Sequence, residues 1–433
     1  MSEIVLCARA LVKGLVCTDY AFAVEDGRII AAGDVASVRR DYPQHPTRSF
    51  DSSTLVVPGF VNGHSHAYQI MLRGWADDLP FEQWRREALY RVVPRLSPDD
   101  VYWVFVAAFS EMLAGGITSV AEFFYLNGKG NAHAEAAIRA SMDAGIRLVF
   151  ARTWMDASDS PTAFTESIDQ AIGRTQALIE QFPATTICPA PHSLHAASPS
   201  MIREAANFAR ARSLPMHVHV AEAGYEGQRT IAEFGRSPVR LLAHLDALFP
   251  GTVLIHGIYV DEDEKDAIAQ AGASVIHNPM TNQYLGDGIC DITGYRRRGV
   301  TVGLGTDANV NPSILSEMRS AALLQKVKKC DASALAARDA FAMGTWEGSA
   351  ALRAPTGDLQ VGSVADYCVV DRTSIDLWSP ALNALVYRAN SSWVHKTFVG
   401  GREVYSVAQD SKLIRDARAA LAQVAQTLDL PPP

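Results

Sequence analysis

Apolar and polar positions follow two different rhythms along the chain. At both ends, short apolar stretches separated by turn residues predict β-strands. Within 1–57 these stretches are 3–12, 20–33 with an Asp-Gly turn, and 54–59; within 356–433 they are 363–371 and 393–405. The two β-rich ends flank a middle of another kind.

In that middle, apolar β-branched runs alternate with longer segments of helical periodicity, such as 97–116 and 198–214, the second opening with a Ser cap. The predicted strands are 55–66, 117–124, 147–154, 185–192, 215–222, 252–258, 273–279 and 300–308. Eight strands and helices over about 250 residues are typical of a (β/α)8 TIM barrel. A doubly wound open sheet is the alternative, but no GxGxxG follows the first strand.

We therefore predict an α/β protein of two parts. A catalytic barrel spans 58–355. Residues 1–57 and 356–433 together form a small β-sandwich, with a helix at the end of the second segment.

Composition narrows the class of protein. Hydrophobic residues make up 48%, charged residues 20%, and the net charge is −8, which argues against a nucleic-acid partner. The six cysteines form no CxxC pair, and no apolar run approaches a membrane span or a signal peptide. We expect a cytoplasmic protein with a small-molecule partner and no membrane partner, and leave self-association open.

Titratable residues gather where the predicted strands end, which in such barrels is where chemistry takes place. Six of the twelve histidines lie at these ends. The residues concerned are His64, His66, Glu122, His192, His219, Glu222, His256, His277 and Asp307. We expect them to converge on one site.

His64-Ser-His66 places two imidazoles on the same side of a strand, where both can bind one ion. HVHVAE supplies His219, and GTDAN supplies the carboxylate of Asp307. Three histidines and one aspartate suit one divalent ion, Zn²⁺ or else Fe²⁺. Such an ion makes hydroxide available at neutral pH. His217, deeper in the barrel, is better explained by packing.

PGFVNGHSH, HVHVAE, IHG and GTDAN, in this order, resemble the amidohydrolase superfamily over nearly the whole chain. The resemblance implies that His64, His66, His219 and Asp307 are metal ligands. It further implies that Glu222 shuttles protons to the substrate nitrogen, that His256 orients water or polarises the susceptible carbon, and that Asp307 accepts the proton of the water. No lysine occurs from 131 to 264, which argues against a lysine-bridged metal pair and favours the mononuclear deaminase branch.

Two groups of substrates compete. HSHAYQ, APHSLHA and LGDGI resemble formimidoylglutamate deiminase, which implies that Gln69 contacts a formimino group while Arg85 and Tyr125 hold carboxylates. The chain departs from that family at His195, where the family has arginine, and at Asn309, where it has histidine.

LRGWADDLPFEQW and HNPMTN are closer to the deaminases and dechlorinases of triazines, purines and pterins, in which Trp75, Phe81 and Trp84 would stack on a flat ring. We expect hydrolytic deamination of an amino-heterocycle or amidine, with the deiminase as the alternative and a dechlorinase or a non-catalytic binding barrel less favoured. The expected substrate-binding set is Gln69, Arg85, Tyr125, His192, His195, His277 and Asn309.

Overall fold

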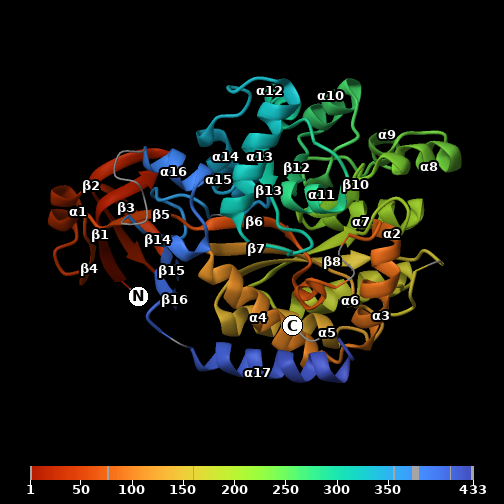
Figure 1. Cartoon of the computed structure of the whole chain (residues 1–433), viewed down its shortest axis with the longest axis horizontal. Coiled ribbons are helices and arrows are strands. Elements are labelled where there is room, and N and C mark those ends of the chain that lie inside the picture. The colour runs from red at the N-terminus through yellow and green to blue at the C-terminus, as the bar shows by residue number, and fades with distance from the viewer. Residues whose placement is uncertain are drawn as a thin grey trace.

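A computed structural model describes residues 2–75, 78–158, 160–354, 356–372, 380–409 and 411–430. At its centre eight parallel strands alternate with helices, and Figure 1 shows this layer of strands with helices around it. The barrel strands are β6 (Phe60–Ser65), β7 (Ile117–Phe124), β8 (Arg147–Trp154), β9 (Thr186–Pro191), β10 (Met216–Val220), β11 (Thr252–His256), β12 (Ser274–His277) and β13 (Val302–Leu304). The predicted (β/α)8 barrel is confirmed, although strand eight is shorter than expected.

The barrel is built from two four-stranded parallel sheets, in the orders β6-β7-β8-β9 and β10-β11-β12-β13. Two seams join them. At the first, the amide of Asp307 donates to the carbonyl of His64 at 3.0 Å, and the amide of His66 donates to the carbonyl of Asp307 at 2.9 Å. At the second, the amide of His219 donates to the carbonyl of His192 at 3.0 Å. These bonds close the ring beside the predicted site.

Helices cover the outside of the ring. The larger ones are α4 (Pro98–Ala114), α5 (Ala132–Ala144), α6 (Ile168–Gln181), α7 (Pro199–Ala211), α8 (Gly224–Phe234), α10 (Glu262–Ala271) and α13 (Ile314–Lys329). Shorter ones are α9 (Pro238–His244), α11 (Pro279–Leu285), α12 (Ile292–Arg297), α14 (Ala337–Met343) and α15 (Trp346–Ala351). The helices α4 and α7 begin at Ser97 and Ser198, whose hydroxyls accept from the amides of Asp100 and Met201.

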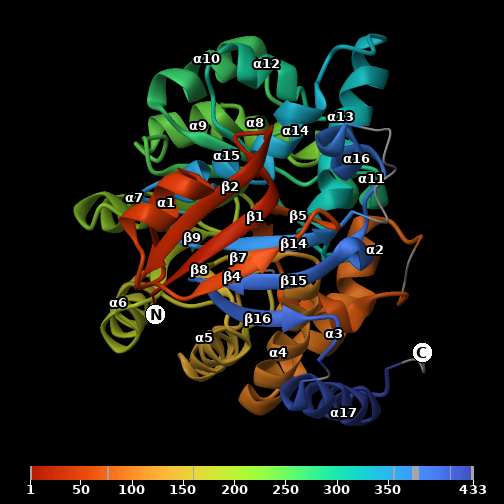
Figure 2. The same cartoon turned by 90° about the vertical axis from the view of Figure 1, so that its left-hand side faces the viewer.

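The two chain ends form one mixed sheet that packs at one side of the barrel (Figure 2). Its strand order is β16-β15-β14-β5-β1-β2-β3, with β4 beside β1. The strands are β1 (Ser2–Val12), β2 (Leu15–Glu25), β3 (Arg28–Asp34), β4 (Thr47–Phe50), β5 (Thr54–Pro58), β14 (Tyr367–Asp371), β15 (Val394–Val399) and β16 (Arg402–Ser406). Phe22 of β2 packs on Tyr367 of β14, so the sheet curls around an apolar core as in a sandwich. The boundaries at 57 and 355 stay predictions.

The segment 55–66, predicted as one strand, is two. β5 pairs with β14 in the small sheet, whereas β6 begins the barrel, and Gly59 lies between them. A Cβ at Gly59 would approach Oγ1 of Thr118 to 2.2 Å, so only glycine lets the chain pass from one sheet to the other here.

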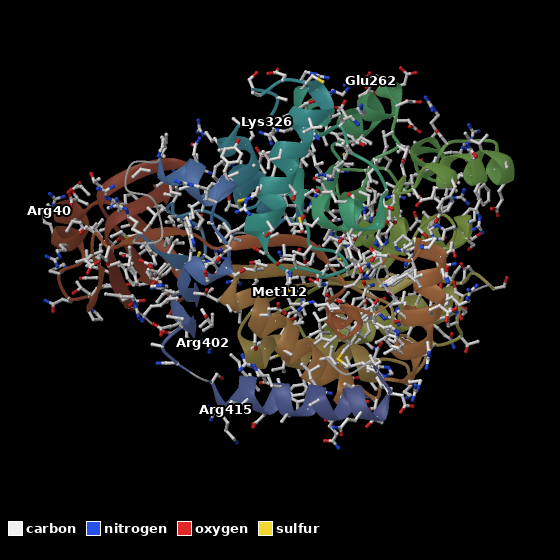
Figure 3. All side chains as sticks on the ribbon, viewed as in Figure 1. Arg40, Met112, Glu262, Lys326, Arg402 and Arg415 are labelled. Atoms are coloured by element: carbon white, nitrogen blue, oxygen red, sulfur yellow. The ribbon has the colours of Figure 1, made fainter. Side chains whose placement is uncertain are left out.

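Smaller helices complete the structure: α1 (Val35–Asp41), α2 (Phe81–Trp84), α3 (Tyr90–Val92), α16 (Ala381–Tyr387) and the predicted terminal helix α17 (Lys412–Thr427). In Figures 1 and 2, α17 lies along α4. Figure 3 shows Arg40, Glu262 and Arg415 at the periphery and Met112 of α4 in the interior. In the described part of the chain, no helix is long and apolar enough to cross a membrane.

Candidate metal and active site

Four side chains from both barrel sheets meet at the carboxyl ends of the strands. Nε2 of His64 lies 3.2 Å from Nε2 of His219 and 3.3 Å from Oδ1 of Asp307. Nε2 of His66 lies 3.5 Å from the same carboxylate oxygen. All four side chains are buried. Three imidazoles and a carboxylate at these distances form a donor set of the kind that binds a divalent metal ion.

In His66 and His219, the hydrogen bond made by Nδ1 shows that Nε2 is the nitrogen that faces the cluster. Nδ1 of His66 donates to the carbonyl of Phe123, and Nδ1 of His219 donates to the carbonyl of His192, both at 2.9 Å. The proton therefore sits on Nδ1, and a lone pair on Nε2 faces the cluster. Backbone carbonyls orient metal-binding histidines in this way.

His256 lies in the same cluster, since it groups with His64, His219 and Asp307 as a set of donor atoms within 4.8 Å of one another. Its Nε2 is 3.4 Å from Oε1 of Glu222 and 3.7 Å from Oδ2 of Asp307. Distance alone thus offers His256 as a ligand in place of His66. Hydrogen bonding distinguishes the two, because Nδ1 of His256 accepts from side-chain amides and does not donate to a carbonyl.

Burial sets the charge state of the cluster. It lowers the pKa of His66 to about 4, and with the neighbouring imidazoles it lowers the pKa values of His64 and His219 well below their usual range. The rings are therefore neutral and can donate lone pairs. Burial also raises the pKa of Glu222 well above its usual range, helped by the charges of Asp287, Asp307 and Glu226, and so favours the protonated form of this carboxyl.

The seam between β6 and β13 holds Asp307 in place. Asn62 donates to Oγ1 of Thr306 at 2.7 Å, and Thr306 donates to the side-chain carbonyl of Asn309 at 2.7 Å. The side-chain amide of Asn309 donates to the backbone carbonyl of Asp307 at 2.8 Å. Asp307 has a φ of +48°, a conformation that non-glycine residues adopt at a cost and that functional sites often contain.

The close packing around Gly305 explains why the GTDAN segment begins with glycine. A Cβ there would lie 2.8 Å from the Cβ of His64 and 2.4 Å from Oδ1 of Asn278. Only glycine lets strand eight approach strand one closely enough to bring Asp307 to His64.

A pocket of about 810 Å³, its open mouth included, lies over the cluster. Its walls carry aromatic and apolar side chains together with a few polar groups, as expected for a small-molecule site. The apolar and aromatic wall residues are Phe81, Trp84, Leu89, Tyr90, Tyr125, Met155, Phe164, Ala196, Tyr225, Leu285 and Ala308. Trp84 and Phe81 stack with ring centroids 6.1 Å apart, whereas Trp75 does not line the pocket.

Five of the predicted substrate-binding residues line this pocket: Gln69, Arg85, Tyr125, His192 and His195. Gln69 donates to the hydroxyl of Tyr125 at 3.4 Å. Arg85 begins a π-helical turn, Arg85–Leu89, pairs with Glu82 at 2.6 Å and lies over the ring of Tyr90. Its charge already has a carboxylate partner within the protein.

Other predicted residues lie outside the pocket. Asn309 is buried in the seam described above, and Glu122 accepts from the backbone amide of Ala67, which holds the turn after His66. His277 and His217 are fully buried, and none of their ring nitrogens has a hydrogen-bond partner among the described residues. The structure thus places His277 and Asn309 behind the pocket wall.

Three polar residues near the site carried no role in the sequence analysis. Glu226 lines the pocket and accepts from the backbone amide of Glu222 at 3.4 Å. Asn282 contacts both His256 and Asp287. Asn282 belongs to HNPMTN, so the motif was visible in the sequence although the contacts were not.

Comparisons with known proteins identify the family. Residues 55–404 match the model of the amidohydrolase family. The 5-methylthioadenosine/S-adenosylhomocysteine deaminase of Syntrophobacter fumaroxidans is 32% identical over 91% of this chain and 89% of its own. The chain belongs to the amidohydrolase family. The 5'-deoxyadenosine deaminase of Methanothermobacter thermautotrophicus is 29% identical over 93% of this chain and 94% of its own.

Solved structures agree. A zinc-bound adenosine deaminase from Xanthomonas campestris superimposes with a TM-score of 0.89, at 26% identity and 98% coverage of both chains. Atrazine chlorohydrolase from Arthrobacter aurescens, at 22% identity over 97% of this chain and all of its own, has the same fold with a TM-score of 0.89.

These matches confirm the predicted class of enzyme, a metal-dependent amidohydrolase of deaminase type. The donor set and the zinc-bound neighbour support a divalent metal ion in the site. The named relatives support hydrolytic deamination of an amino-heterocycle, and they do not support the formimidoylglutamate alternative specifically.

Proposed function

We propose that this amidohydrolase uses one zinc ion per chain to remove an amino group, as ammonia, from a heterocycle of the aminopurine type. One observation carries the proposal. Glu222 and His256 lie 3.4 Å apart beside a buried His/Asp donor set, at the bottom of an aromatic-walled pocket. A donor set, a protonatable carboxyl and a hydrogen-bond donor are the groups that hydrolytic deamination needs.

The residues fit zinc. Nδ1 of His219 donates to the carbonyl of His192, so a lone pair on its Nε2 faces Nε2 of His64 across 3.2 Å, and Nδ1 of His64 is available to carry the proton of that ring. A cation between the two Nε2 atoms would then bind both lone pairs. His66 and Asp307 would supply the other protein donors. Zinc held there would lower the pKa of a bound water molecule and make hydroxide available near neutral pH.

The side chains of this protein then accept and donate the protons that the reaction moves. The carboxylate of Asp307 accepts the proton of the attacking water. Nε2–H of His256 donates to the oxygen that adds to the substrate carbon, and so stabilises its developing charge. Glu222, whose pKa burial raises, carries a proton to the amino nitrogen. The C–N bond breaks and the nitrogen leaves as ammonia. Of the two protons of the water, the one taken by Asp307 replaces the proton that Glu222 gave up, and the hydroxyl proton moves to the ring nitrogen, which leaves a carbonyl beside a ring N–H.

The pocket walls support a flat ring as substrate. Trp84, Phe164 and Tyr125 present aromatic surface, and the polar edge formed by Gln69 and His192 can hydrogen-bond to ring nitrogens. The relatives named as deaminases of adenine nucleosides favour a purine over a triazine or a pterin. Arg85 is paired with Glu82, which weighs against its holding a substrate carboxylate.

Ammonia release by the zinc-loaded enzyme tests the proposal. The panel comprises adenine, adenosine, 5-methylthioadenosine, guanine, aminopterins, aminotriazines and formimidoylglutamate. We expect turnover of an adenine derivative, and Arg85→Met should change kcat/KM for it by less than about threefold, the effect of a weak exposed ion pair. Turnover of formimidoylglutamate alone, abolished in Arg85→Met, would overturn the substrate class. No metal in the purified protein and no turnover after zinc loading would overturn the function.

A further inference from the structure

Asn282 of α11 links the carboxylate of Asp287 to the ring of His256. One Nδ2–H donates to Oδ2 of Asp287 at 3.1 Å, and the other donates to Nδ1 of His256 at 3.0 Å. Asn282 and His256 are both buried. The orientation of the amide follows from the carboxylate, because a flipped amide would place its carbonyl oxygen against the negative Asp287.

The contact determines where the proton of His256 sits. Nδ1 accepts from Asn282 and, at 3.3 Å, from the side-chain amide of Asn278, so it must be unprotonated. The proton of the neutral ring is therefore on Nε2, which faces Glu222 and Asp307. In His66 and His219 the arrangement is the reverse, with Nδ1 protonated.

The backbone fixes the direction in which the ring of His256 points. His256 ends β11 with a φ of +73°, which costs about 1–3 kcal/mol in a residue other than glycine. The next carbonyl, of Gly257, accepts from the hydroxyl of Tyr295 at 2.8 Å. A strained residue persists where its surroundings fix it, and here the surroundings aim the ring of His256 into the site.

We propose that Asn282, held by the carboxylate of Asp287, is a positioning residue that fixes His256 as the Nε2–H tautomer. His256 is thereby kept as a hydrogen-bond donor to the reacting oxygen and is prevented from binding the metal in place of His66. The inference deepens the function proposed above and rests on it for the role of His256. The position of the proton is independent of any substrate.

The tautomer can be observed directly by NMR of the zinc-loaded protein labelled with ¹⁵N-histidine. The signal that disappears in His256→Gln belongs to His256, and we expect its proton on Nε2. In Asn282→Asp, the new carboxylate accepts a hydrogen bond from the ring, so the proton moves to Nδ1. Asp287→Asn frees the Asn282 amide to flip and gives a mixture of the two forms.

Kinetics provide the second readout. Asn282→Asp should lower kcat about 10- to 100-fold with little change in KM and with zinc retained. Gln283→Glu, the matched amide-to-carboxylate change on the exposed side of the same helix, should leave the tautomer and kcat unchanged.

A His256 proton on Nδ1 in the unaltered enzyme, or an unchanged tautomer in both Asn282→Asp and Asp287→Asn, would overturn the proposal. So would a loss of activity in Asn282→Asp that is fully explained by a smaller fraction of folded, zinc-loaded protein. If no substrate releases ammonia, the proposed function fails while the NMR result still decides the tautomer.

Discussion

Glu222→Gln should lower the activity of the enzyme without lowering its stability. The change keeps the size of the side chain but removes the proton that the reaction transfers to the leaving nitrogen. Such groups contribute about 10²- to 10⁴-fold to rate, which is about 3–5 kcal/mol of activation free energy. We expect kcat to fall by this factor and the metal content to stay the same, because Glu222 is not one of the four proposed ligands.

The same change should not destabilise the fold. Glu222 and Asp307 both lie within 4 Å of Nε2 of His256, so their carboxylate oxygens are at most about 7 Å apart. When Glu222 holds its proton, glutamine replaces one neutral group by another of the same size, so Tm should not fall. When Glu222 is ionised, two negative charges at that distance repel by about 2 kcal/mol at an effective dielectric constant of 20, and removing one of them should leave Tm equal or higher.

The assay is ammonia release with the best substrate, together with elemental analysis and thermal unfolding of the same samples. Glu233→Gln, an exposed position on α8, is the matched control and should change neither kcat nor Tm. A Glu222→Gln enzyme with kcat within about tenfold of the unaltered one would refute the proton-carrier role. If Glu222→Gln lost its metal together with its activity, Glu222 would be needed for metal binding, and the proposed role as a proton carrier alone would be wrong.

Three further predictions concern the metal and the buried histidines. His66→Gln should release the ion, as elemental analysis would show, whereas His256→Gln should keep it and lose kcat; the opposite result would exchange their roles. Chelation should abolish ammonia release and lower Tm, since an ion that binds only the folded chain stabilises it by about 4 kcal/mol at 1,000 times Kd; activity that survives complete metal removal would contradict the mechanism. Burial, with the charge of Lys328, lowers the pKa of His277 to about 3 from 6.5, so the unfolded chain binds the extra proton between these values. The stability that this residue contributes above pH 6.5 is therefore lost as the pH falls, by up to about 5 kcal/mol. His277→Met should flatten the dependence of the unfolding free energy on pH. Identical slopes in the variant and the unaltered protein would show that His277 does not titrate as inferred.

The barrel could be predicted because each of its strands is a short apolar run bounded by polar residues. This pattern is local in the sequence and does not depend on which residues the strand contacts in the folded chain. The site followed from the same pattern, since strand ends meet at one face. The division at Gly59 could not be predicted, because it depends on Thr118, a residue far away in the sequence. The seam that buries Asn309 likewise depends on Asn62 and Thr306, contacts that no local pattern records.

The pocket was harder to predict than the donor set. Arg85 was visible as a charge on a helix, but its partner Glu82 and the π-turn that presents it are features of packing. HNPMTN was recognised as a motif, yet the role of Asn282 rests on Asp287, which lies beyond the motif and meets it only in the folded chain. Hydrogen bonds and ion pairs between residues three to five positions apart, which depend on the conformation of each turn and not on residue type alone, determine these roles.

The two seams of the barrel give the metal ion a mechanical role as well. His64 and His66 belong to the first four-stranded half, whereas His219 and Asp307 belong to the second, and each seam bond involves one of these residues or its neighbour. An ion held by all four fastens one half-barrel to the other. Its loss should therefore speed amide hydrogen exchange first along the seams, at Asp307 and His219, while the middle of each half stays protected.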